Sequence, residues 1–310
     1  MSTEQLLVSP WGKCSTPISP EMSVQEMLVE ADLNWKVERE PLGYFKDEEF
    51  VPTGGVALIR STDKAVLEPY VTEMWNHIEN EQAIEFMDQF VRKIGNNIDY
   101  LGSVKKGKLI FGLSELRGEK FDLFKGEDTI SSYFLLSNPH AYGQAFDIRF
   151  TAVRDRCFNT LTRGLTRKGD LEIRLHHRAA FDGEIAERAV FAAKANLAQY
   201  SEMANLLASK KYEDGDVDLY YRAVFPTNAT KGGKDKLSKP ARLAQANIDT
   251  QPGAKYGRGT WWQIYNSATY VIDHLVGWAP ETRLYAAWYG HNRKRKNQAL
   301  HLACEFAKAA

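Results

Sequence analysis

Residues 98–150 contain four short apolar runs that predict two antiparallel hairpins. Ile98–Val104 and Leu109–Leu113 are joined by a Lys-Lys-Gly turn, and Tyr133–Ser137 and Ala145–Phe150 are joined across an Asn-Pro-His sequence and Gly143. In the last run apolar residues alternate with charged ones, which is typical of a strand with one buried face. The rest of the chain therefore has to cover an antiparallel sheet.

Helical periodicity is found in the sequence both before and after the predicted strands. Ser23 and Glu26 have the spacing of a capping box, and apolar residues recur at helical spacing after Asn80. Helices are expected at residues 23–31, 80–94, 151–165, 180–209 and 260–275, and from about residue 294 onward. We therefore predict an α+β fold, in which a curved antiparallel β-sheet of hairpins packs with long helices and a C-terminal helical segment follows.

Composition and predicted secondary structure divide the chain into four regions. We predict an N-terminal arm at residues 1–52, an α+β core at 53–226, a basic mobile linker at 227–259 and a C-terminal helical segment at 260–310. The linker is expected because this stretch combines a glycine pair, two prolines and five lysines.

Composition and sequence patterns restrict the class of protein to which this chain can belong. No run approaches the ~18 apolar residues of a membrane span, and the first residues lack the pattern of a signal peptide. The three cysteines are far apart and odd in number, which indicates free thiols in a reducing compartment. We expect a cytoplasmic protein with no membrane partner and no cofactor.

Charge is unevenly distributed although the formal net charge is zero. The first fifty residues are rich in acids, whereas Arg149–Arg178, Lys231–Arg258 and Arg283–Lys296 are rich in bases. Because local potential governs the attraction of a polyanion, this segregation favours a nucleic-acid contact.

The basic residues of two of these stretches are the candidate contacts. On a strand, a helix and a strand, the arginines of 149–178 would share one face, which Asp155, Asp170 and Glu172 could instead neutralise. The densest basic cluster is HNRKRKNQ (His291–Gln298). The predicted nucleic-acid-binding residues are Arg149, Arg156, Arg163, Arg167, Lys168, Arg174, His176, Arg178, Arg293, Lys294, Arg295 and Lys296.

Other chemistries have weaker support in the sequence. Cys157 and His176 suggest a thiol nucleophile, but Cys157 lies on an apolar stripe, which favours a buried structural thiol. His140, His176 and Asp147 could form the centre of a metal-dependent nuclease. No phosphate-loop sequence is present, so ATP binding is not expected.

One block carries a resemblance to a known family. RFTAVRDRCFNTLTRGL (Arg149–Leu165), followed by LEIRLHHRA, resembles the phage/plasmid-like proteins defined as a domain of unknown function, most specifically at Arg154, Cys157, Asn159 and Thr160. Further matching blocks are VPTGGVALIR, IENEQAIEFMDQFV, GTWWQIYNSATYVIDH and YGHNRKRKNQALHLA. This resemblance implies a protein of a mobile element.

The order of hairpins and helix is also similar to that of single-strand annealing proteins of the RecT, Redβ and Rad type. That resemblance implies a protein without enzymatic activity that binds single-stranded DNA, anneals it without ATP during recombination, and forms a homo-oligomeric ring or filament. The alternatives are the nuclease described above and a host-interaction or anti-defence protein of a mobile element.

Overall fold

Both predicted hairpins are present in the computed structural model, which describes residues 9–142, 144, 146–164, 174–175, 183–227 and 237–309. The first consists of β5 (Tyr100–Val104) and β6 (Leu109–Leu123), and the second of β7 (Asp128–Pro139) and β8 (Phe146–Arg154). These strands form one antiparallel sheet in the order β1-β5-β6-β7-β8, where β1 is Ser15–Pro17. Both β9 (Thr160–Gly164) and β10 (Arg174–Leu175) pair with the remaining edge of β8.

The large sheet is buried on both faces. On β7, Phe134 and Leu136 belong to the main hydrophobic core, whereas Tyr133 and Leu135 belong to a smaller cluster with Trp288. Because neighbouring side chains point to opposite faces of a strand, both faces need apolar residues. This explains the continuous apolar run that identified the strand in the sequence.

Helices cover the two faces unequally. Helices α2 (Val24–Glu30), α3 (Asn80–Lys93) and α4 (Gly183–Ser209) contribute to the main core, together with α5 (Asp214–Val224), α6 (Lys239–Ala246), α7 (Trp261–Tyr270) and α9 (His291–Ala309). Helix α8 (Pro280–Trp288) contributes to the smaller cluster. Short helical turns lie at Phe124–Gly126 (η1) and Ala254–Gly257 (η2), and Val271–Leu275 (η3) is a π-helical turn. The C-terminal helices therefore share one core with the sheet, and the predicted α+β class is confirmed.

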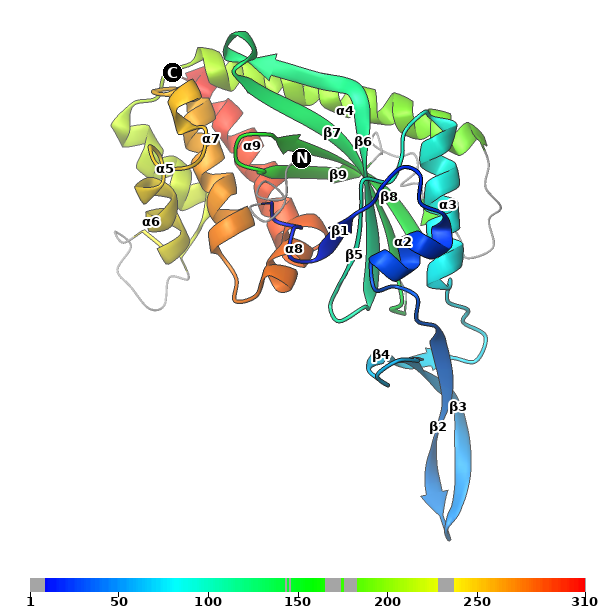
Figure 1. Cartoon of the computed structure of the whole chain (residues 1–310). Helices are drawn as coiled ribbons and strands as arrows, with labels where there is room; N and C mark the ends of the chain where they lie inside the picture. Colours follow the sequence, from blue (N-terminus) through cyan, green and yellow to red (C-terminus); the bar gives the residue numbers. More distant parts are fainter. Residues whose placement is uncertain are drawn as a thin grey trace.

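A second sheet packs its inner end against this body, where Val56, Leu58 and Val71 belong to the main core. It has the order β2-β3-β4, with β2 at Val37–Lys46, β3 at Glu49–Arg60 and β4 at Val66–Thr72. The outer part of β2 and β3 projects from the molecule as a two-stranded ribbon (Figure 1). Within β3, Val56–Arg60 follows a Gly-Gly pair, which is a strand signal readable from the sequence.

The helix predicted at residues 151–165 is wrong. Strand β8 continues to Arg154, a tight turn follows, and β9 returns beside it with Val153 opposite Thr160. Phe158 closes the turn with a φ of 53°. The turn divides the apolar residues that suggested one helix face, because Val153 on β8 belongs to the smaller cluster and Leu161 on β9 belongs to the main core.

The predicted linker is also corrected in its described part. Residues 228–236 lie outside the described chain, but α6 and η2 occupy much of the remainder. Ser238 caps α6, Pro240 stands in its first turn, and Ala241 and Ala244 are buried. Proline at a helix start is favourable because its missing N–H has no helical partner to lose.

The helices of the described residues were compared with the length and hydrophobicity of a membrane span, and none of them meets both requirements.

Candidate anion-binding pocket

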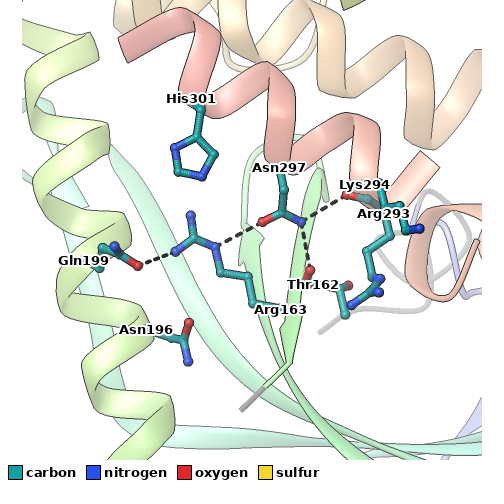
Figure 2. Close-up of a pocket in the computed structure, with 8 residues that line it drawn as sticks. All are labelled: Thr162, Arg163, Asn196, Gln199, Arg293, Lys294, Asn297 and His301. Carbon is teal, nitrogen blue, oxygen red and sulfur yellow. Dashed lines mark hydrogen bonds between the residues drawn. The ribbon is translucent and has the colours of Figure 1, made fainter. Parts of the chain in front are cut away.

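Strand β9 and helices α4 and α9 line an open polar pocket of about 360 Å³ (Figure 2). Its lining residues are Thr162, Arg163, Asn196, Gln199, Arg293, Lys294, Asn297 and His301. Two arginines, a lysine and a histidine stand among neutral polar side chains, and none of these eight lining residues is acidic. This composition suits a negatively charged ligand.

Arg163 extends across the pocket and is held by two amide side chains. Its Nε donates to Asn297 Oδ1 at 3.2 Å, and one terminal nitrogen donates to Gln199 Oε1 at 2.8 Å. Asn297 in turn donates from Nδ2 to the carbonyl oxygen of Thr162 at 3.1 Å. These partners fix the direction of the guanidinium without neutralising its charge.

The charge of Arg163 has no carboxylate counterion within the described chain. Burial lowers the pKa of its guanidinium, but an arginine in a protein remains protonated. A half-buried positive charge without an opposite charge is unfavourable. An anion in the pocket would relieve this cost.

Helices α9 and α4 form the other walls of the pocket. Arg293, Asn297 and His301 are four residues apart on α9, and Asn196 and Gln199 are three apart on α4, so each set lies on one helix face. Arg293 and Lys294 stand in the first turn of α9, where their charge adds to the partial positive charge of the helix end. The potential at this side of the pocket is therefore positive.

Only part of the predicted basic surface meets at this pocket. Arg163, Arg293 and Lys294, which belonged to two separate candidate contacts in the sequence, are brought together. Sequence reasoning missed Thr162, Asn196, Gln199, Asn297 and His301, because it searched for charge and passed over neutral polar residues. The four-residue spacing of Arg293, Asn297 and His301 was the available signal.

The single arginine face predicted for residues 149–178 is wrong. Arg163 is opposite Phe150 in the β8–β9 register and contacts α4, whereas Arg149 lies on the other face of the sheet. There Arg149 forms an ion pair with Asp147, with 2.9 Å between Nε and Oδ2, and stacks on the Tyr289 ring at 4.9 Å. The two arginines cannot share one groove.

The other residues predicted to contact nucleic acid do not line the pocket where the structure describes their side chains. Arg156 is exposed in the β8–β9 turn, where it donates to the Glu127 carbonyl and lies over the Tyr256 ring. Arg295 donates to Asn292 and lies over the Phe225 ring. Arg174 is described only by its pairing in β10. Arg167, Lys168, His176 and Arg178 lie outside the described residues.

Lys296 cannot serve as a surface contact. Its side chain is completely buried, and Nζ donates to Asp273 Oδ1 at 2.7 Å and to Thr160 Oγ1 at 2.6 Å. The basic cluster of α9 therefore divides by helix face, since Lys296 points into the core while Arg293 and Lys294 line the pocket.

Comparison with known protein families identifies the family of this chain. Residues 69–301 match the family described as Domain of unknown function (DUF932). The chain belongs to the DUF932 family. No curated protein and no solved structure matches it. The family resemblance read from the sequence is thus confirmed, and the matched range contains the whole of the pocket.

The family block RFTAVRDRCFNTLTRGL forms a buried polar junction between the sheet and the C-terminal helices. Arg154 is 2% exposed and pairs with the fully buried Asp128, with 2.8 Å between nitrogen and oxygen. Trp262 on α7 donates from Nε1 to the same carboxylate at 2.8 Å. Arg154 also donates to the carbonyl of Gly253 at 2.9 Å. These contacts tie β7 and β8 to η2 and α7.

Two further residues of the block continue this junction. Asn159 donates to Thr269 Oγ1 on α7 at 2.9 Å, and the Thr160 backbone N–H donates to Asp273 Oδ2 at 2.7 Å. Cys157 is 1% exposed, and burial raises the pKa of its thiol, which disfavours the nucleophilic thiolate. The expectation of a buried structural thiol is confirmed.

The proposed nuclease centre is not assembled from its described members. His140 is completely buried, its Nε2 is bonded to Asn80 Oδ1 at 2.9 Å, and burial lowers its pKa to about 3. Asp147 is bound to Arg149, and His176 lies outside the described residues. Among the side chains that the structure places, no group of three or more His, Cys, Asp or Glu could hold a metal ion.

Proposed function

We propose that this DUF932 protein binds single-stranded DNA by holding backbone phosphates in the pocket between β9, α4 and α9. The observation that carries the proposal is the Arg163 guanidinium, which two neutral amides orient and no carboxylate in the described chain neutralises. A phosphate accepts from guanidinium, ammonium and amide N–H groups, which the pocket combines.

Strand annealing without ATP is the activity we propose for this binding. Base pairing of complementary strands is downhill, so a protein that holds backbones and leaves the bases accessible needs no catalytic group. The protein would act in this way in recombination or replication of a phage or plasmid, in the host cytoplasm and as a homo-oligomer. The neutral polar residues of the pocket favour phosphate contacts without base specificity.

We expect the double variant Arg163→Gln/Lys294→Gln to bind a single-stranded oligonucleotide at least tenfold more weakly, because each charge-assisted hydrogen bond contributes about 1.5–3 kcal/mol. The salt dependence should also become shallower, by a slope of about 0.7 for each phosphate that the variant no longer holds. Fluorescence anisotropy at about 50 mM and about 200 mM salt measures both quantities.

Arg117→Gln is the matched control, because Arg117 is an exposed arginine on β6 that does not line the pocket and was not a candidate contact. It should bind as tightly as the unmodified protein. Equal binding by the double variant and the unmodified protein would rule out the pocket as the contact. Unmodified protein that binds no oligonucleotide at low salt would overturn the proposed function.

Annealing is tested separately from binding. Two complementary oligonucleotides, one with a donor and one with an acceptor dye, should anneal faster with the protein than without it, with no ATP or metal ion added. Binding without faster annealing would contradict the annealing activity and leave DNA binding in place.

A further inference from the structure

The outer part of the β2–β3 hairpin has no support from the rest of the protein. We call residues 42–53 the β-arm, and every side chain in it is exposed or only half-buried. The ribbon extends well beyond the body (Figure 1). A two-stranded ribbon that is solvated on both faces is only marginally stable by itself, so a partner surface would stabilise it.

An aromatic pair lies near the tip of the β-arm. Phe45 and Phe50 are cross-strand partners with ring centroids 5.7 Å apart, and they are 76% and 44% exposed. Gly43 lies beneath this pair, where an added Cβ would be 2.6 Å from the Phe50 ring. The glycine thus lets the ring lie against the backbone. The result is an ordered apolar surface of the kind that anchors protein interfaces.

The charge of the arm indicates which class of partner it fits. Its turn consists of Asp47 and Glu48, which have φ values of 50° and 69°. The β-arm contains one lysine against three acids, hence a net charge of −2. Nucleic acid and anionic lipid are disfavoured by this charge. Because the whole chain is neutral, the remaining residues carry +2.

We propose that the β-arm docks on the body of a second copy of this chain. The aromatic pair would be buried there, and the acidic turn would meet a body of opposite net charge. Such a contact joins two different surfaces, so two copies can exchange arms as a closed dimer, or successive copies can extend the contact into a ring or a filament. Arm-to-arm pairing would instead bring two acidic turns together. The inference does not depend on DNA binding.

The test is the mass of the full chain in solution over a range of concentrations, measured by sedimentation. The unmodified protein should self-associate, and Phe45→Ser/Phe50→Ser should do so about tenfold or more weakly, as expected for loss of a central aromatic anchor. Both side chains lie outside the hydrophobic cores, so the variant should keep the circular dichroism spectrum and thermal midpoint of the parent.

Phe191→Ser is the matched control, because Phe191 on α4 is 74% exposed, which is close to the exposure of Phe45. It should associate like the parent. A parent protein that stays monomeric at every concentration, or an arm variant that associates as strongly as its control, would overturn the proposal.

The contribution of charge to self-association is tested separately. Glu48→Lys/Glu49→Lys should weaken self-association, and the association of the parent should weaken as salt is raised. Self-association that is insensitive to both changes would show that charge does not select the partner. Oligonucleotide binding is measured on the same variants, and it should persist when self-association is abolished, which separates failure of this inference from failure of the proposed function.

Discussion

Asp128→Ala is expected to lower the free energy of unfolding by about 3–5 kcal/mol, because it leaves a buried guanidinium without its counterion. Arg154 is almost completely buried, and Asp128 accepts hydrogen bonds from it and from Trp262. Arginine cannot escape by releasing its proton. The cost should therefore change little between neutral and alkaline pH. Urea denaturation followed by tryptophan fluorescence measures it.

Asp88→Ala is a matched control on the surface. Asp88 also pairs with an arginine, since Arg92 Nε lies 2.7 Å from its carboxylate, but the Arg92 side chain is 45% exposed. Exposed pairs contribute about 0–1 kcal/mol. Similar costs for the two substitutions would contradict the view that the Arg154–Asp128 pair is a desolvated junction.

The sequence predicted the central sheet because local signals and burial agree there. The turn at residues 105–107 and the apolar runs on either side identify the hairpin of β5 and β6, and the register pairs Tyr100 with Leu113. The β-arm was missed for the opposite reason. Its side chains are exposed on both faces, so it lacks the alternation of apolar and polar residues by which a half-buried strand is recognised.

Sequence charge identified part of the pocket lining but did not show which cations are paired or buried in the fold. Arg163, Arg293 and Lys294 were chosen for their charge, and they do line the pocket. Arg149 and Lys296 were chosen by the same criterion, yet Arg149 is paired with Asp147 on its own strand and Lys296 is buried. Charge in a sequence does not show which carboxylate will lie beside it, because Asp273 is 23 residues away from Lys296.

The family block has a structural role that supports the pocket indirectly. Lys296 and the pocket residues Arg293 and Asn297 are on the same helix, while Thr160 and Arg163 are on the same strand. The contact of Lys296 with Thr160 and Asp273 therefore sets how α9 lies against β9. Because β9 and α9 form two walls of the pocket, the buried Lys296–Asp273 pair positions the pocket residues on both elements.

Asp273→Asn is expected to cost about 3–5 kcal/mol of unfolding free energy near neutral pH, because Lys296 then remains buried beside a neutral amide. Its pH dependence should differ from that of Asp128→Ala, since lysine can release its proton. Burial already lowers the pKa of Lys296, and the charge of Asp273 opposes this shift. Without that charge the pKa of Lys296 falls further.

Between this lowered pKa and the value of about 10.4 for lysine in the unfolded chain, the unfolded state binds more protons than the folded state. The stability of the variant therefore rises with pH across this window, and its deficit relative to the parent shrinks. Denaturation near neutral pH and at about pH 9 measures the change. Adding Lys296→Met to Asp273→Asn removes the stranded charge, so the double variant should recover much of the missing stability and show no such rise. A deficit that is the same at both pH values would mean that Lys296 is not the group left uncompensated.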